Sequence, residues 1–292
     1  MLWFFLAFSS ALLSAAAAIS QKKVLFQIPA LEFSFTLAII NMLFTLPILF
    51  GIDFSTVSSI GLLVLYGKTI LGALAFWCVM LAIKNLELSG ALPLLSLTPG
   101  FVALFAFIII GERLNEYEIT GMLLLLCGTY IIDSRKHKNI LEPFKVFFNS
   151  KNHRYILFAL ILFTTSSILD KVILVEYNLS PYEFICFQHI FLAINFSILI
   201  LIFGKSPKVI FKNIDTNLWK WLVLISIITI GYRYTQIEAV KIAPVALVLT
   251  VKRFSVLFAA IIGGRIFNEH HLLRKSIATA IIILGAVLIL QK

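Results

Sequence analysis

Charged residues are scarce in this sequence. Asp, Glu, Lys and Arg together make up 13% of its 292 residues, whereas hydrophobic residues make up 61%. A soluble domain of this length carries about a quarter charged residues, so this chain has too few polar side chains to cover a globule. The mean hydropathy of +1.03 agrees with that conclusion. The composition therefore excludes a soluble globular protein and predicts a membrane protein.

Cysteine is also scarce, and recognised catalytic motifs are missing. Cys78, Cys127 and Cys186 each lie within an apolar run and lack metal-ligand spacing, so we interpret them as small core residues. The sequence has no nucleophile elbow and no P-loop. His270 and His271 are adjacent, which would point them about 100° apart on a helix and make them a poor metal pair. We therefore expect no enzyme activity, no metal and no cofactor.

The charge that is present is unbalanced, with a formal net charge of +10. The basic residues lie between hydrophobic runs rather than on a soluble domain, so we expect them in loops on the cytoplasmic side and not in contact with nucleic acid. Most of them fall in the odd-numbered loops between the expected spans. The positive-inside rule then places these loops in the cytoplasm and both termini outside.

Ten stretches approach the ~20 apolar residues that a membrane helix needs. The first lacks the basic start of a signal peptide, and we interpret it as a membrane helix, with cleavage as the alternative. The ten stretches are 2–20, 31–50, 57–83, 88–110, 117–133, 155–176, 182–203, 219–240, 244–267 and 272–290.

The two halves of the chain resemble each other. Residues 82–112 align with residues 239–269 without a gap, and Lys84 then meets Lys241 while Glu112 meets Glu269. Because each half has five spans, an odd number, the second half must enter the membrane from the opposite side. Such inverted repeats are typical of secondary transporters, whose site lies near the midplane between the repeats.

The predicted fold is therefore all-α and membrane-integral, with ten transmembrane helices arranged as two inverted five-helix repeats around a central cavity. We expect a first repeat over residues 1–133, a basic connecting loop over 134–154 and a second repeat over 155–292.

Two segments resemble the EamA family of the drug/metabolite transporter superfamily. They are "APVALVLTVKRFSVLFAAIIGGRIFNE" in the second half and "TPGFVALFAFIIIGERLNEYEITGMLLLLCGTYI" in the first. This resemblance implies ten spans and transport of small metabolites such as amino acids, without identifying the substrate. It also implies both termini inside, as proteins of this family are commonly drawn, against the orientation that the loop charges favour. Family members often carry an arginine early in the second and seventh spans, but this chain has Gln188 and His189 in the seventh.

A pair of cations lies deep in the ninth stretch. Each of Lys252 and Arg253 would cost about 2.5–3.5 kcal/mol at the centre of a membrane helix. By residue count, Asp170, Lys171 and Arg233 lie at a similar depth. We expect Asp170 to pair with one cation, and the remaining positive charge to bind an anionic group.

Other polar and aromatic residues complete the candidate site. Gln188 and His189 lie inside the seventh span and need a partner or water. Tyr232 and Tyr234 flank Arg233, and because they point about 200° apart, only one of them can face a cavity beside it. The candidate substrate-binding residues are Lys252, Arg253, Arg233, Asp170, Gln188, His189, Tyr234 and Trp77.

The predicted function is secondary transport of a small polar metabolite, an amino acid or another carboxylate-bearing solute, by alternating access. The expected partners are that solute and the bilayer of the plasma membrane, with a homodimer left open. One alternative is a transporter or flippase-like carrier of a lipid-linked substrate, which a cavity open to lipid would favour. The other is a membrane scaffold without transport, which would lack a cavity. The sequence leaves open the coupling ion and the direction of transport.

Overall fold

A computed structural model describes residues 1–85, 98–133, 151–212, 214–255, 258 and 281–288. Every regular element in these ranges is helical. Several predictions lie outside the described residues. They are the start of the fourth span, most of the central loop, the later part of the ninth span, the segment that contains Glu269, His270 and His271, and the start of the tenth span.

The helices follow the predicted spans closely. They are α1 (Leu2–Leu25), α2 (Ala30–Thr45), the 3₁₀ helix η1 (Leu46–Gly51), α3 (Ser59–Asn85), α5 (Thr98–Ile110), α6 (Glu116–Asp133), α8 (Lys151–Val175), α9 (Pro181–Ile202), α10 (Pro207–Lys212), α11 (Thr216–Ile242) and α12 (Val245–Lys252). Residues 281–288 are also helical.

Five of the described helical stretches are long and apolar enough to cross a membrane, judged by length and composition. They are Leu2–Leu25, Ala30–Gly51, Ser59–Leu81, Leu157–Val175 and Pro181–Ile202. The second stretch changes from α to 3₁₀ geometry after Thr45 because Pro47 lacks the N–H that an α-helix would require. The chain is thus a helical membrane protein in the parts that the structure describes.

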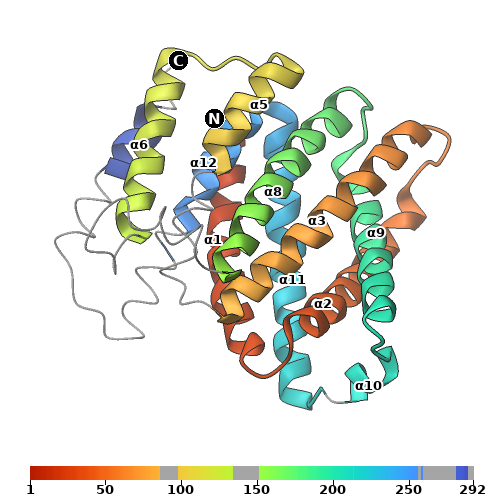
Figure 1. Cartoon of the computed structure of the whole chain (residues 1–292). Coiled ribbons are helices and arrows are strands. Elements are labelled where there is room, and N and C mark those ends of the chain that lie inside the picture. The colour runs from red at the N-terminus through yellow and green to blue at the C-terminus, as the bar shows by residue number, and fades with distance from the viewer. Residues whose placement is uncertain (86–97, 134–150, 213, 256–257, 259–280, 289–292) are drawn as a thin grey trace.

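The helices of the two halves pack against each other rather than in separate bundles (Figure 1). Helix α1 lies along α11, and α3 lies along α8. The first span of each half therefore packs on the third span of the other half. Helix α2 packs on α9, and α5 packs on α12, which pairs equivalent spans of the two halves. This reciprocal contact pattern is what two related halves facing each other would produce.

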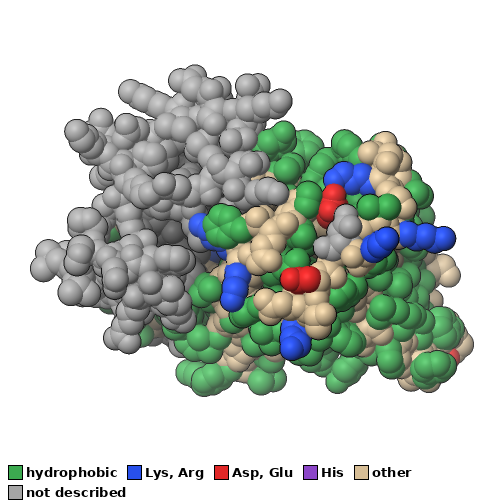
Figure 2. Space-filling view, turned by 90° about the horizontal axis from the view of Figure 1, so that it is seen from below, with side chains coloured by type: hydrophobic (Ala, Val, Ile, Leu, Met, Phe, Trp, Pro, Cys, Tyr) green, Lys and Arg blue, Asp and Glu red, His purple; other side chains and the backbone are tan. Residues whose placement is uncertain are grey.

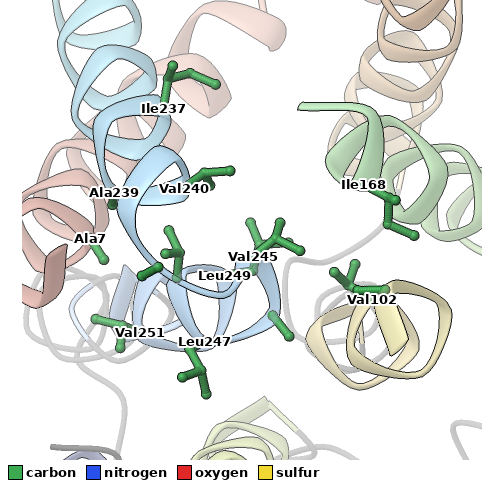
Figure 3. Packing of buried hydrophobic residues seen from close by; sticks show 14 of the residues in the cluster. Ala7, Val102, Ile168, Ile237, Ala239, Val240, Val245, Leu247, Leu249 and Val251 are labelled. Atoms are coloured by element: carbon green, nitrogen blue, oxygen red, sulfur yellow. The ribbon is translucent and has the colours of Figure 1, made fainter. Parts of the chain in front are cut away.

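Helix α12 lies at the centre of one hydrophobic core. All residues from Val245 to Val251 are buried, and a helix that is apolar all round is a buried helix. Figure 3 shows its side chains against the end of α11 and against residues of α1, α5 and α8, among them Ala7, Val102 and Ile168. Helix α12 is bounded at Lys252, and helical geometry resumes at Phe254 after the turn at Arg253. Most of the remaining span predicted to residue 267 lies outside the described residues. Because α12 is buried in this core, Lys252 and Arg253 at its end lie inside the protein.

The two ends of the bundle carry opposite charge. At the lower end in Figure 1 lie the α1–α2 turn and the α9–α11 connection. Figure 2 shows this end from below, with Lys and Arg side chains gathered on it. The cations in these segments are Lys22, Lys23, Lys205, Lys208, Lys212 and Lys220. We call this end the basic face.

The opposite end is acidic. It carries the connections that follow η1, α5, α8 and α11, at the top of Figure 1. The carboxylates in or next to these connections are Asp53, Glu112, Glu116, Glu118, Glu176, Glu183 and Glu238. We call this end the acidic face.

We expect the basic face to lie in the cytoplasm, because Lys and Arg in short loops are retained there. Single cysteines at Ser206 on the basic face and at Glu176 on the acidic face, both exposed, would be introduced into a chain with Cys78, Cys127 and Cys186 replaced by serine. An impermeant maleimide added to intact cells should label Glu176→Cys and leave Ser206→Cys unlabelled until the cells are opened. The reverse pattern would contradict this orientation.

Candidate functional site

Asp170, on α8, is the carboxylate at the centre of the site. Its side chain is 2% exposed, its Oδ1 lies 2.7 Å from Nζ of Lys68, and its Oδ2 accepts a hydrogen bond from Arg233 Nη2 at 2.7 Å. The predicted pairing of Asp170 with a deep cation is confirmed. Because a buried charge is tolerated only when it is paired, the carboxylate ties α3 of the first half to α8 and α11 of the second.

Gln188 and Phe184, on α9, complete the surroundings of the two cations. The Gln188 Oε1 accepts hydrogen bonds from Lys68 Nζ at 2.7 Å and from Arg233 at 2.8 Å (Nη2) and 3.2 Å (Nε). The Phe184 ring lies 5.0 Å from the ammonium of Lys68 and 5.7 Å from the guanidinium of Arg233. An aromatic face attracts cations electrostatically, so α9 stabilises the cluster without adding charge.

Lys252 and Arg253 lie where α12 is interrupted. Arg253 donates its backbone N–H to the carbonyl oxygen of Thr250 at 3.0 Å, a tighter turn than that of an α-helix. Irregular backbone at membrane depth is tolerated where it is buried in protein or lines a cavity. The carbonyl end of a helix also favours cations. Lys252 Nζ donates to Gln236 Oε1 at 2.5 Å and lies 4.6 Å from the centre of the Tyr232 ring.

These groups face a common cavity of about 360 Å³, within the range of small-molecule sites. Its lining includes four cations and one carboxylate, namely Lys68, Arg233, Lys252, Arg253 and Asp170. It reaches Gln21 near the end of α1, Ser34 near the start of α2, and Met80 near the end of α3. The end of α1, the start of α2 and the end of α3 lie toward the basic face in Figure 1, so the cavity extends from the charged cluster in that direction.

His189 lines the same cavity and is 2% exposed. Neither of its ring nitrogens has a hydrogen-bond partner among the described residues. Buried polar groups are nearly always hydrogen-bonded, and one that is not calls for an explanation such as a bound ligand or water. The imidazole is therefore a donor available to a molecule in the cavity.

On the acidic side of the cluster, one ion pair joins several elements. Lys171 Nζ donates to the carbonyl oxygens of Val240 at 2.9 Å and Ala243 at 2.8 Å, at the end of α11, and lies 3.8 Å from Glu112 Oε1. Glu112 Oε2 accepts from the backbone N–H of Val245, the first residue of α12, at 3.0 Å. Glu112 and Lys171, which we call the latch, thus hold α8, α11, α12 and the α5–α6 connection together.

The structure brings together most of the predicted site residues. Lys252, Arg253, Arg233, Asp170, Gln188 and His189 all line the cavity.

Three aromatic and basic side chains lie elsewhere than predicted. Tyr234 donates to Glu238 Oε1 at 2.8 Å and packs on Tyr182, outside the cavity lining. Trp77 packs edge-on against Phe203, also outside the lining. Lys171 belongs to the latch, because adjacent residues on a helix point about 100° apart and Asp170 takes the inward position.

Tyr232 takes the cavity-facing place that was assigned to Tyr234. The sequence showed that only one of these tyrosines can face the cavity beside Arg233, and it offered no signal to choose between them.

Lys68 was missed by the sequence analysis. It is 4% exposed and makes the shortest described contact to Asp170 Oδ1. The signal was present, because a single lysine in the middle of the apolar stretch "LLVLYGKTILGALAF" is as costly as either member of the pair at 252 and 253.

The fold and the charged central cavity together define a helical membrane protein with an internal polar cavity. The model of the EamA-like transporter family matches residues 1–133 and 153–291, and the chain belongs to that family. A solved crystal structure described only as "Crystal structure of protein" has the same fold, with a TM-score of 0.74 at 16% identity, over 99% of this chain and 96% of that one. No curated protein matches the chain.

We predict that Asp170→Asn strongly destabilises the protein, because it leaves Lys68 and Arg233 buried without a counter-charge. Breaking a buried ion pair by removing one partner typically costs about 3–5 kcal/mol. Thermal unfolding of the purified protein in detergent would measure the loss. Lys68→Met combined with Asp170→Asn should recover part of it. A single Asp170→Asn variant as stable as the parent would show that the carboxylate is not the structural counter-ion.

Proposed function

We propose that the protein is a secondary transporter that moves a small anionic solute across the plasma membrane by alternating access between two inverted five-helix repeats. The observation that carries this proposal is the surplus of buried and half-buried cations around the cavity. Four cations and one carboxylate line it among the described residues, so an anionic solute that enters it meets predominantly positive side chains. Ionisable residues inside membrane proteins commonly mark substrate paths.

The position of the cavity supports a transport site. Lys68 comes from the first half of the chain, and the other charged residues of the site come from the second half. The cavity therefore lies between the two halves, where transporters built from inverted repeats bind their substrates. The reciprocal packing of α1 on α11 and of α3 on α8 supports two related halves that rock against each other.

The cavity also weighs against a scaffold without transport, which needs no internal space. The lipid-linked alternative requires a cavity open to the bilayer, and the polar residues at the centre of this cavity favour a water-soluble solute instead. We therefore place the solute between α3, α8, α9, α11 and α12.

The latch is the proposed gate on the acidic face. The cavity extends toward the basic face, while Glu112 and Lys171 join four elements on the other side of the cluster. A conformation open to the acidic face would have to separate these elements, and so break the latch. While the contacts of Glu112 and Lys171 are formed, the protein would bind solute from the basic side.

We predict that Arg253→Ala and Lys252→Ala abolish transport in proteoliposomes while leaving the protein folded. Truncating a residue that binds a charged group typically costs at least about 2 kcal/mol, which is roughly 30-fold in affinity. Arg253→Lys should also lose activity, because lysine cannot reproduce the planar two-point contact of arginine with a carboxylate.

The matched control is Lys241→Ala, since Lys241 is exposed at the end of α11. This variant should transport as the parent does. Full transport by Arg253→Ala would contradict the assignment of the site.

We predict that acid pH and Glu112→Gln both weaken the latch. Burial raises the pKa of Glu112, although Lys171 and the Val245 N–H oppose the rise and Glu118 adds to it. As pH falls through this raised pKa, Glu112 gains a proton and loses its attraction to Lys171. At neutral pH, Glu112→Gln should therefore resemble the parent protein at acid pH.

The readout is labelling of a cysteine at Ser167, which is buried in the cavity wall, by an impermeant maleimide added on the acidic face. The rate would be normalised to that of Glu176→Cys at each pH. Labelling should rise several-fold in Glu112→Gln at neutral pH, and acid should then have little further effect. Equal labelling with and without the substitution would rule out the latch as the gate.

A further inference from the structure

We infer that the cavity binds small organic carboxylates with an apolar body and without an ammonium group, in preference to zwitterionic amino acids. This inference rests on the proposed function for the claim of transport, but it concerns binding and is tested by binding. It follows from the charges at one end of the cavity and from the side chains along the rest of it.

The charged end of the cavity suits an anion. Asp170 already contacts Lys68 through one oxygen and Arg233 through the other, and it is the one carboxylate among the described lining residues. Lys252 and Arg253 add two further positive charges at the end of α12. A carboxylate that enters here meets a net positive field in a medium of low dielectric constant, where each charge acts strongly.

His189 adds a directional contact at the same end. Its ring is buried, faces the cavity and lacks a hydrogen-bond partner among the described residues. An imidazole carries at least one N–H in both its neutral and its charged form. It can therefore donate to a ligand oxygen, and a carboxylate with four acceptor positions can use this donor together with the cations.

An ammonium group meets no free carboxylate among the described residues that line the cavity. The oxygens left to it are neutral ones, such as those of Gln21, Ser34 and Thr69. It would need a carboxylate or several free carbonyl or amide oxygens, but both oxygens of Asp170 are already paired. The amide oxygens of Gln188 and Gln236 are also taken, by Lys68 and Arg233 and by Lys252. The four cations would in addition repel a positive group. An amino acid would thus bind with its ammonium beside neutral oxygens at best, without a free counter-charge.

Away from the charged end, the cavity wall combines large apolar side chains with hydroxyl and amide groups such as those of Ser34, Asn41 and Thr69. Toward the basic face the apolar part of this wall is built from Leu37, Phe76, Val79, Met80, Leu192 and Phe196. Burying apolar surface there is favourable by about 25 cal/mol per Å², so a ligand gains affinity from a hydrocarbon body behind its charged group. A small hydrophilic anion such as acetate would leave this wall uncovered.

The test uses three ligands with one phenyl skeleton: 3-phenylpropanoate, phenylalanine, which adds an ammonium, and 2-phenylethylamine, which lacks the carboxylate. Binding to the purified full-length chain would be measured by calorimetry in nanodiscs. We expect 3-phenylpropanoate to bind at least about tenfold more tightly than phenylalanine or acetate, the equivalent of 1.4 kcal/mol, and phenylethylamine not to bind. Equal or tighter binding of phenylalanine, or no binding of 3-phenylpropanoate, would overturn the inference.

Gln188→Glu provides a second test that should leave the fold intact. A glutamate keeps an oxygen for Lys68 and Arg233 and adds one negative charge beside them. It should therefore weaken 3-phenylpropanoate binding about tenfold or more. The melting temperature of the protein should stay the same or rise. Gln27→Glu is the matched control, because Gln27 is exposed on the α1–α2 turn, and it should bind as the parent does. Unchanged binding by Gln188→Glu would contradict the role of the cation surplus.

Binding and transport can fail separately. If 3-phenylpropanoate binds as expected but does not enter proteoliposomes, the ligand class stands and the transport function is wrong. If phenylalanine binds and is transported at least as well as 3-phenylpropanoate, transport stands and the ligand class is wrong.

Discussion

The carboxylate of Asp170 is the constraint on which the arrangement of the helices depends. It is buried between Lys68 and Arg233, at 2.7 Å from each. Each of these charges alone would be costly inside a membrane protein, and together they are tolerable only at close range. The geometry of α3, α8 and α11 is therefore fixed around one group. Because α3 belongs to the first half of the chain and the other two belong to the second, the same ion cluster also holds the halves together.

The two ends of the molecule differ in how they are closed. Toward the acidic face, Lys171 and Glu112 bind the end of α11 and the start of α12, so backbone groups that a helix leaves unsatisfied at its ends are used as partners. Toward the basic face, the cavity continues along the small and apolar residues of α1, α2 and α3. Contacts that use the ends of helices are broken by small rotations of those helices, which is suitable for a gate.

The helices were predictable because apolar length specifies a membrane helix almost without regard to its neighbours. The depth of Asp170, Arg233, Lys252 and Arg253 was predictable for the same reason, since residue count along a helix gives depth. The direction in which each side chain points around its helix was not predictable from the sequence. Lys171 and Asp170 lie at the same depth but point to different places, and the choice of Tyr232 over Tyr234 depends on how α11 packs. Trp77 was assigned from the alignment of the two halves, which does not determine what a side chain contacts. The turn at Arg253 has no local sequence signal such as an adjacent proline or glycine.

The charge surplus links binding to movement in the proposed transport cycle. When the cavity is closed at both ends, its cations lose contact with water, and the cost of that step grows with the charge left uncompensated. Asp170 compensates part of this charge permanently. A bound carboxylate would compensate more, so it would lower the free energy of the closed state relative to that of the empty protein. A ligand shifts a conformational equilibrium only if it binds one of the two states more tightly than the other. Here the tighter binding to the closed state would come from the dehydration of the same four cations that recognise the ligand. Recognition and coupling would then depend on one set of side chains, and an anion too small to exclude water from the apolar wall would bind without driving the closure.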